Sequence, residues 1–390
     1  MKFNNIRIMI PILFSLIFIY AISLIFIYTL PSVNAPDNIS QSHKIFNEEG
    51  NYRVLSTEFK SQTQLDNFTD LRIMVPRSAS SDNPSFAAID MGGYSRYWHG
   101  YQVVLRPLIS FFNYEQVRFL LSTLLISLLC VSSSLIWKRM GLVYSICFVV
   151  SMCFVHIEAI GMSVQFSSVF FIAMISSIFI LKSDRYDDGI IGRLGIPAFF
   201  MIIGSVTNFF DLLTAPLLTL TLPLSILIII NDDVTLTNLK TIVITSISWS
   251  VGYALTWISK WIISYLFISH SAISDAINQI FFRSMGSEKY PLHRDIMLRD
   301  NFVTMFLDYR VAILIVLVFI CALIILKSKE LGKAISLISI SAMPYVWYMA
   351  LSNHSQIHFW FTFRSQMPTM FCFLVVTVMV SKRIYIRLRK

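Results

Sequence analysis

The feature that most constrains this chain is a series of apolar runs, each long enough to form a helix across a lipid bilayer. Charged residues make up 14% of the 390 residues and hydrophobic residues 56%, and the charges cluster in short patches between the runs. A helix that crosses a bilayer needs about 20 apolar residues. Because lipid offers the backbone no hydrogen-bond partner, runs of this length are expected to be helices.

About ten such runs can be placed, and they predict an all-α fold: one integral membrane domain over 1–390, a polytopic transmembrane helical bundle whose large external loops contain short helices. The first run is longer than the apolar core of a cleavable signal peptide, so we interpret it as an uncleaved span. Asn208 and Asp211 interrupt the stretch 195–230, which predicts two helices joined by a tight turn. The expected spans are 8–30, 119–137, 141–160, 165–181, 195–210, 213–230, 241–268, 311–326, 334–352 and 367–381.

The distribution of basic residues predicts the orientation of these spans. With the N-terminus inside, the segments assigned to the cytoplasm hold 16 basic and 6 acidic residues, and the C-terminus also lies inside. Basic residues favour the cytoplasmic ends of spans, so the net charge of +9 indicates topology and not nucleic-acid binding. The expected location is the plasma (inner) membrane, with large external loops at 31–118 and 269–310 and a shorter one at 353–366.

The first external loop carries the acids that are best suited to catalysis. Asp66 and Asp70 are four residues apart, so in a helix their carboxylates share one face. Such a pair can act as a general base, share a proton or bind a divalent cation. The structural alternative is that Asp66 only caps a helix. Asp90 follows in the sequence IDMGG, where a turn is expected.

Two further segments combine basic and aromatic residues near the ends of spans. Arg96, His99 and Arg106 lie in YSRYWHGYQVVLRP (94–107), which either anchors at the head-group level or cradles a phosphate while its aromatics stack on a sugar or isoprenoid. His354 and His358 have helical i, i+4 spacing in the last external turn, but no glutamate follows His354 in the pattern of a zinc protease.

Other candidate residues lie near the ends of the spans. Arg364, beside aromatic residues, is a better candidate than the histidines for a phosphate contact. Asp211 either faces a cavity or caps the next helix in water. We expect a structural cluster of His156, Glu158 and Gln165.

All five cysteines lie in apolar runs and are interpreted as small buried hydrophobes, without a disulfide or metal role.

The order of these features resembles the GT-C type of polytopic glycosyltransferases of bacterial surface-polysaccharide loci. The resemblance lies in LDNFTD (65–70), YSRYWHGYQVVLRP (94–107), TNFFDLLTAPLLTL (207–220) and SNHSQIHFWFTFR (352–364). It implies transfer of a sugar from a polyprenyl-phosphate carrier to a cell-surface glycan or lipid acceptor on the outer face of the membrane.

The same resemblance implies roles for individual residues. An acid of the first external loop, among Asp66, Asp70 and Asp90, would be the general base, and Arg96, Arg106 and Arg364 would stabilise the leaving phosphate. The acidic pair lies about 35 residues after the first span instead of directly after it, which leaves the choice of acid open. Some members use a divalent metal, and nothing in the sequence decides that point.

Two other functions are compatible with many spans and large external loops. A polysaccharide polymerase or ligase would use glycans linked to polyprenyl diphosphate. A transporter or flippase would need polar groups near the bilayer midplane, whereas most polar groups here are expected at the outer ends of the spans.

Overall fold

The computed structural model describes residues 6–31, 35–79, 81–183, 189–231 and 234–389. Within these ranges the chain is helical, and its only β-type pairing is two isolated bridges, Val54 with Gln64 and Ser287 with Tyr290. The expected all-α class is confirmed. Some charged residues that were counted as cytoplasmic lie outside the described residues: Lys2, Asp184, Arg185, Asp187, Asp188, Asp232, Asp233 and Lys390.

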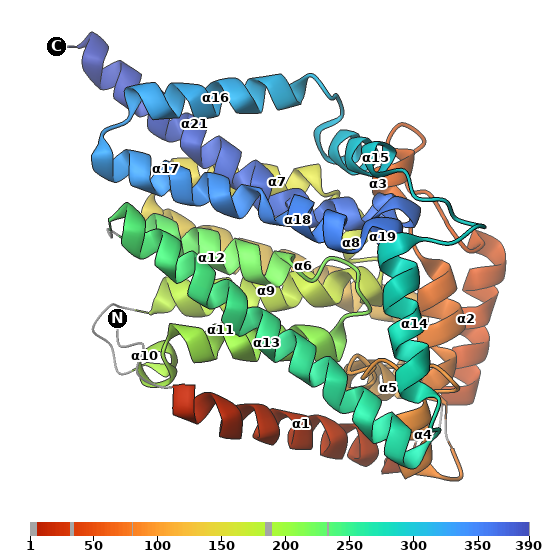
Figure 1. Ribbon diagram of the computed structural model, residues 1–390. Coiled ribbons are helices and arrows are strands. Elements are labelled where there is room, and N and C mark those ends of the chain that lie inside the picture. The colour runs from red at the N-terminus through yellow and green to blue at the C-terminus, as the bar shows by residue number, and fades with distance from the viewer. Residues whose placement is uncertain (1–5, 32–34, 80, 184–188, 232–233, 390) are drawn as a thin grey trace.

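Each expected span coincides with one helix or two consecutive helices that run along the length of the bundle (Figure 1). Successive helices of this set alternate in direction (Figure 1). These helices are α1 (Ile6–Thr29), α6 (Tyr114–Met140), α7 (Leu142–Phe154), α9 (Val164–Lys182), α11 (Ile196–Phe210), α12 (Leu218–Ile230), α13 (Thr235–Phe267), α16 (Val311–Ile325), the pair α17 (Ser328–Ser341) and α18 (Met343–Ala350), and α21 (Met367–Leu388).

Among the described residues, five helices are long and apolar enough to cross a membrane, or six if the bent pair α15 (Arg294–Phe306) and α16 forms one span. This number is lower than the expected ten. The difference arises mainly because α7, α11 and α12 have 13, 15 and 13 residues, or about 20 Å of helix each at 1.5 Å per residue. Helices of this composition are typical of a membrane protein.

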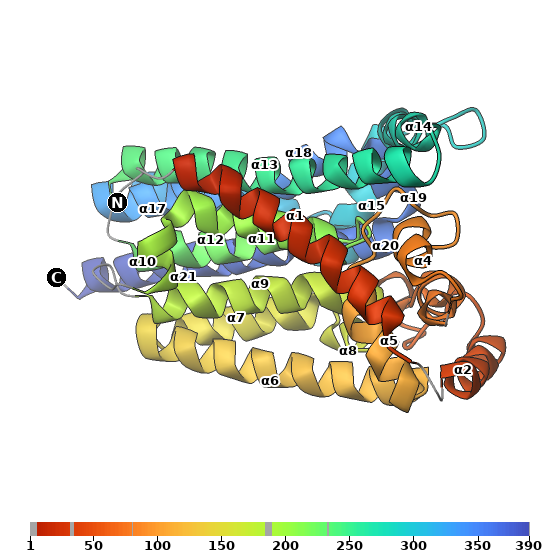
Figure 2. The ribbon, with the colours of Figure 1, turned by 90° about the horizontal axis from the view of Figure 1, so that it is seen from below.

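The short helices of the two large loops, of the shorter loop 353–366 and of the α7–α9 connection gather at one end of the bundle, which we call the loop end (Figures 1 and 2). The start of α1 and the end of α21 lie at the opposite end, together with α10 (Ile190–Leu194). Residues far apart in the sequence therefore meet at the loop end. Its helices are α2 (Ala35–Glu49), α3 (Lys60–Thr63), α4 (Pro84–Asp90), α5 (Gln102–Phe111), α8 (Ile157–Ile160), α14 (Ala272–Met285), α15, α19 (Ser352–Ile357) and α20 (Phe359–Thr362).

Two glycines allow α11 and α13 to pack in direct backbone contact. A Cβ atom at Gly204 would lie 2.0 Å from the carbonyl oxygen of Trp249, and one at Gly252 would lie 2.0 Å from that of Met201. Small residues permit this close approach between membrane helices. Helix α1 lies across this pair (Figure 2). The bundle therefore holds the end of α11, and the turn that follows it, in a fixed place at the loop end.

The cysteines divide between two environments. Cys147 and Cys372 are buried, as expected, but Cys130, Cys153 and Cys321 are exposed on the outside of the bundle. The expectation of buried thiols was wrong for these three. A thiol is a weak hydrogen-bonding group that behaves as a small hydrophobe, so an apolar run does not distinguish an inward from an outward position.

Candidate functional site at the loop end

Asp66 and Asp70 lie on one turn of the first long loop, as their spacing predicted. The chain enters the helical turn η1 (Phe68–Met74), and the backbone N–H of Asp70 donates to the carbonyl oxygen of Asp66 at 3.0 Å. The Asp66 carboxylate accepts hydrogen bonds from the N–H and the hydroxyl of Thr69, at 3.1 and 2.8 Å. Asp66 thus caps this turn, but it is also a buried acid with 6% of its surface exposed.

Asp70 lies deeper and joins the loop to two helices of the bundle. Its carboxylate accepts a hydrogen bond from the hydroxyl of Tyr114 at the start of α6, and another from the backbone N–H of Gln165 at 3.2 Å. Gln165 is in the first turn of α9, where backbone N–H groups have no partner inside the helix. The acid therefore satisfies a helix end and is almost completely buried, with 1% of its surface exposed.

Burial changes the protonation of both acids. It raises the pKa of Asp66 to about 6; the hydrogen bonds from Thr69 oppose this effect, and the charge of Asp70 adds to it. Burial also raises the pKa of Asp70, although the hydroxyls of Tyr114 and Ser163 and the N–H of Gln165 favour its charged form. A carboxyl group whose pKa is near the working pH is suited to accept a proton. Of the two, Asp66 is the more exposed.

An ion pair that the sequence did not indicate fixes this acidic turn. Arg118 of α6 donates to Glu49 at 2.8 Å and to the side-chain oxygen of Asn67 at 2.8 Å, while its Nε donates to the carbonyl oxygen of Met162 at 2.9 Å. Its side chain is 3% exposed. Because Asn67 directly follows Asp66, Arg118 holds the acidic turn against α2 and α6. We therefore assign Arg118 a structural role and not a role in substrate binding.

Arg364 lies beside the first turn of α9 and donates to backbone carbonyl groups. Its guanidinium donates to the carbonyl oxygens of Val155, Trp360 and Gln62, at 3.3, 3.3 and 2.8 Å, and it is completely buried. It lies 4.4 Å from the ring centre of Phe166, which follows Gln165 in α9. The acidic pair and Arg364 therefore surround the first turn of α9, and Arg364 provides a positive charge there without an exposed donor.

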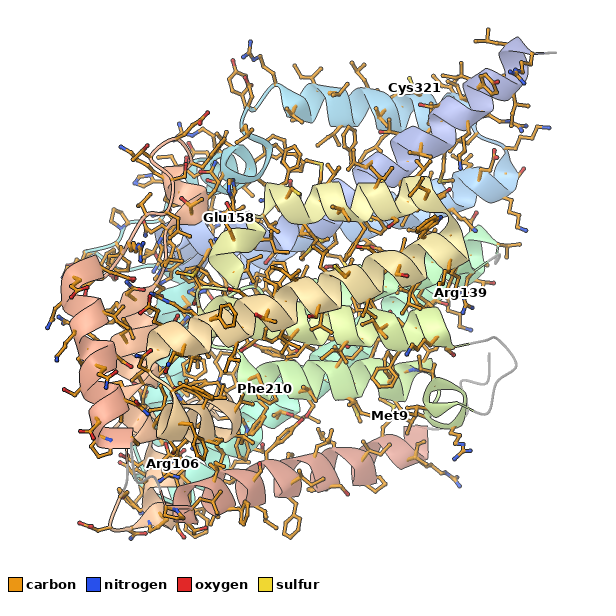
Figure 3. All side chains as sticks on the ribbon, turned by 180° about the vertical axis from the view of Figure 1, so that it is seen from behind. Met9, Arg106, Arg139, Glu158, Phe210 and Cys321 are labelled. Carbon is orange, nitrogen blue, oxygen red and sulfur yellow. The ribbon has the colours of Figure 1, made fainter. Side chains whose placement is uncertain are left out.

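Arg106 caps the end of α1. It donates to the carbonyl oxygens of Ile27 and Leu30, and its guanidinium lies 5.1 Å from the ring centre of Tyr28 (Figure 3). The last carbonyl groups of a helix have no partner inside the helix, and basic side chains near that end can satisfy them. Arg106 was expected to contact a phosphate, but in the structure it attaches α5 to α1.

The segment 94–101 docks on the end of α11. The N–H of Gly100 donates to the carbonyl oxygen of Phe209 at 2.7 Å, in a contact so close that a Cβ atom at Gly100 would overlap the Phe209 ring. His99 pairs with the hydroxyl of Tyr101 at 2.6 Å and with the carbonyl oxygen of Tyr94 at 2.8 Å. Burial lowers the pKa of His99 to about 3. His99 is therefore neutral with both nitrogens occupied, which leaves it no donor for a phosphate.

Arg96 and Asp90 lie on the side of α13 and α4, apart from the contacts that hold Asp66 and Asp70. Arg96 forms an ion pair with Asp275 of α14 at 3.2 Å, and its guanidinium lies 4.1 Å from the ring centre of Tyr94. Asp90 accepts a hydrogen bond from the N–H of Gly93 at 2.9 Å, which stabilises the turn after α4. The residues singled out from the sequence therefore fall into two separate groups at the loop end, one around Asp66 and Asp70 and the other around Arg96 and Asp90.

Asp211 stabilises the turn between α11 and α12. Its carboxylate accepts the N–H of Thr214 at 3.0 and 3.1 Å, only 3% of its surface is exposed, and burial raises its pKa to about 7. His354 donates through Nε2 to the carbonyl oxygen of Leu213 at 2.8 Å, because its Nδ1 accepts a hydrogen bond from Arg283 at 3.0 Å. Two sets of hydrogen bonds therefore stabilise the turn: those that Asp211 accepts within it, and the one that His354 of α19 donates to it.

The two histidines do not form a metal site with other ligands. Both nitrogens of His354 are occupied, and burial lowers the pKa of His354 and of His358, the latter to about 4. The ring of His358 stacks on Phe361 with 4.9 Å between centres. Across the described ranges there is no group of three or more His, Cys, Asp or Glu side chains that could hold a metal ion.

The expected cluster of His156, Glu158 and Gln165 is only partly present. His156 and Glu158 form a pair at 2.8 Å, at the loop end (Figure 3). Gln165 belongs instead to the acidic site, since its backbone N–H contacts Asp70 and its side chain hydrogen bonds to Asp66.

An apolar groove of about 420 Å³ lies among α5, α6, α9 and α11. Several of its lining residues are at the loop end, and three of them adjoin the candidate residues. Val164 donates its N–H to the hydroxyl of Tyr114, the residue that contacts Asp70. Tyr101 contacts His99. Phe210, labelled in Figure 3, is the last residue of α11 and directly precedes Asp211. The other lining residues are Val104, Leu105, Leu108, Val117, Leu121, Ser167, Ser168, Phe171, Ile172, Ile175, Ser176, Phe179, Phe199, Ile202, Ile203 and Val206. The groove was not predicted, because an apolar sequence does not show which helix faces pack together and which leave a space.

No family model, curated protein or solved structure matches this chain. Because folds of this kind host many activities, the function has to be argued from the site alone.

Proposed function

We propose that this chain is a multi-pass glycosyltransferase of the plasma (inner) membrane. It would transfer a sugar from a polyprenyl-phosphate carrier to a cell-surface glycan or lipid acceptor. In this proposal about ten segments cross the membrane, including the short helices α7, α11 and α12, and the loop end faces outward. Its support is the arrangement of the two large loops and the shorter loop 353–366 at one end of the bundle, with the basic tail of α21 at the other (Figure 1). Basic residues favour the cytoplasmic side.

The observation that carries the proposal is the position of the apolar groove beside the acidic pair. Val164 lines the groove, and its N–H is bound by the same Tyr114 hydroxyl that donates to Asp70. An isoprenoid chain is apolar and fits a groove without polar partners. With the chain in the groove, its phosphate would lie at the loop end, near the level of Asp66. A soluble substrate has no long apolar chain that such a groove could bind.

Asp66 is the proposed general base. Its carboxylate would take the proton of an acceptor hydroxyl, whose oxygen forms the new bond to the anomeric carbon. The bond between that carbon and the phosphate oxygen breaks with its electron pair, so the polyprenyl phosphate leaves as an anion. Asp70, Tyr114 and Arg118 would hold the turn that carries Asp66. Arg364 would stabilise the developing negative charge through space, since buried charges act strongly at short range.

Of the three arginines proposed for the phosphate, the geometry favours Arg364. Arg106 donates through Nη1 to two carbonyl groups at the end of α1, which makes it a positioning residue. Arg96 lies against α13 and α14, where its neighbours suggest a different ligand.

The test is sugar transfer by the purified chain in nanodiscs, with a panel of synthetic polyprenyl-phosphate hexoses as donors and cell-envelope glycan as acceptor. Asp66→Asn should lower the rate at least about a hundredfold, the usual contribution of a general base. Asp82→Asn, which changes an exposed acid of the same loop, should retain the rate. Full activity of Asp66→Asn would reject the assigned base, and no transfer from any donor by the intact chain would reject the activity.

The product distinguishes the proposed transferase from the alternatives. A single added sugar supports the transferase, whereas a ladder of glycan lengths made from a diphosphate-linked donor would replace it with a polymerase. Movement of the lipid-linked sugar across the bilayer without transfer would replace it with a flippase. The clustering of the buried acids at the loop end favours the transferase over the flippase.

A further inference from the structure

Two guanidinium groups surround the ring of Tyr97 at the loop end. The Cζ atom of Arg96 lies 5.6 Å from the centre of this ring and that of Arg283 lies 5.9 Å from it. Asp275 forms an ion pair with Arg96 at 3.2 Å and is half exposed. None of the described carboxylates lies within ion-pair distance of Arg283. The pair of arginines therefore carries more positive charge than its immediate neighbours neutralise.

A hydrogen bond to His354 holds Arg283 in place. Its Nη1 donates to Nδ1 of His354, which in turn donates through Nε2 to the carbonyl oxygen of Leu213. Its Nε is buried, and within the described residues it has no acceptor. A buried donor without a partner is destabilising. Such an arrangement fixes the guanidinium while leaving its hydrogen-bonding capacity for an oxyanion.

Aromatic rings lie beside the two arginines. The Tyr97 ring stacks between those of Tyr94, at 5.4 Å, and Trp257, at 5.7 Å. Trp257 and Trp261 both donate through Nε1 to the carbonyl oxygen of Arg96, which fixes the segment against α13. Tyr94, Trp257 and Trp261 are each half-buried. Their partly open rings offer apolar faces on which the C–H groups of a pyranose can pack.

From this juxtaposition we propose that Arg96, Arg283, Tyr94 and Trp257 form a binding site for an acidic saccharide, a pyranose that carries a carboxylate or a phosphate. The oxyanion binds the two guanidinium groups, and the sugar ring packs on the aromatic side chains. If the chain is the transferase proposed above, this site holds the glycan acceptor, and that extension rests on the proposed function. Binding itself requires no transfer.

The experiment measures saccharide binding to the full chain in nanodiscs by calorimetry and tryptophan fluorescence. The probes are an oligosaccharide of glucuronic acid, a neutral glucose oligosaccharide of the same length, and decyl phosphate. We expect the acidic oligosaccharide to bind at least about tenfold more tightly than the neutral one, because hydrogen bonds between charged groups are stronger than those between neutral groups. Arg283→Gln should remove this preference, and Arg283→Lys should retain part of it.

The matched control is Arg299→Gln, which changes an exposed arginine of the same loop that pairs with Asp300. It should leave the preference intact, and the melting temperature of each variant separates lost binding from lost folding. Equal binding of acidic and neutral probes would overturn the proposal. So would binding of decyl phosphate that depends on Arg283 while the glucuronate oligosaccharide does not bind, since the site would then hold the carrier's phosphate. Because no donor sugar is present, failure of the transferase proposal leaves this result unaffected.

Discussion

The hydroxyl of Tyr114 donates a hydrogen bond to the buried carboxylate of Asp70 and accepts one from the N–H of Val164. One side chain at the start of α6 thus joins the acidic turn of the first long loop to the first turn of α9. The apolar groove begins at the same place, since Val164 is part of its lining. A lipid chain in the groove and an acid at its end would share this contact.

Tyr114→Phe tests this contact. The substitution removes the hydroxyl but keeps the ring, and leaves Asp70 with fewer donors in a buried position. Because a hydrogen bond to a charged group is worth about 1.5–3 kcal/mol, we expect a clearly lower melting temperature in nanodiscs. Tyr309→Phe, at a tyrosine that is 68% exposed, is the control and should melt like the wild type. Identical melting of both variants would show that the hydroxyl contributes nothing.

A second prediction concerns the pH dependence of stability. Burial raises the pKa of Asp66 from 3.8 to about 6, so the folded chain binds its proton more tightly than the unfolded chain. The stabilisation is fully present below about pH 4 and is lost as the pH rises through about 6, with a size of about 2–3 kcal/mol. Melting temperatures of the wild type should therefore fall over this range relative to those of Asp66→Asn. Parallel curves for the two proteins would contradict the raised pKa.

The sequence predicted the positions of the helices well and the partners of the site residues poorly. Apolar runs locate helices because each helix must satisfy its backbone internally, and the i, i+4 spacing placed Asp66 and Asp70 on one turn. The partners of these acids come from distant segments: Gln165 is 95 residues from Asp70. Spacing within a segment carries no information about such contacts.

The contacts of the arginines also could not be predicted from the sequence. Arg364 lies beside aromatic residues, as the sequence predicted, but it donates to a carbonyl group 302 residues earlier in the chain. Arg106 similarly caps a helix 79 residues away. The sequence did not single out Arg283, because it lies among charges of both signs in the second large loop. Only the fold brings it to Tyr97 and His354.

The close packing of α11 on α13 gives a third prediction. Gly204→Ala places a methyl group where the carbonyl oxygen of Trp249 lies, so the helices must separate. Overpacking of this kind costs about 1–3 kcal/mol or more, and we expect a lower melting temperature and weaker saccharide binding, because α13 carries Trp257. Gly192→Ala, in the exposed face of α10, should be neutral or slightly stabilising because alanine favours helices. Unchanged melting of Gly204→Ala would refute the close contact.

A fourth prediction concerns the orientation of the bundle. Asp82→Cys adds a thiol at the loop end and Ser328→Cys adds one at the opposite end, both at exposed positions. In intact spheroplasts a membrane-impermeant maleimide should label the thiol at position 82, and it should label the thiol at position 328 only after lysis. The wild-type chain, whose five cysteines all lie in helices, measures the background. The reverse pattern would place the loop end inside the cell and remove the basis for an external glycan site.

The last prediction concerns the apolar groove. Ser168 of α9 lines it, so Ser168→Phe would fill part of its volume with a ring while leaving Asp66 and Asp70 unchanged. If the groove holds an isoprenoid chain, photocrosslinking of the protein to a diazirine-bearing polyprenyl phosphate should fall at least about tenfold, since a filled pocket loses the burial energy of several methylene groups. Ser127→Phe is the matched control, because Ser127 lies on an exposed face of α6 where a phenyl ring would face lipid. Equal crosslinking of the two variants would show that the carrier binds elsewhere, and the acid beside the groove would lose its proposed substrate.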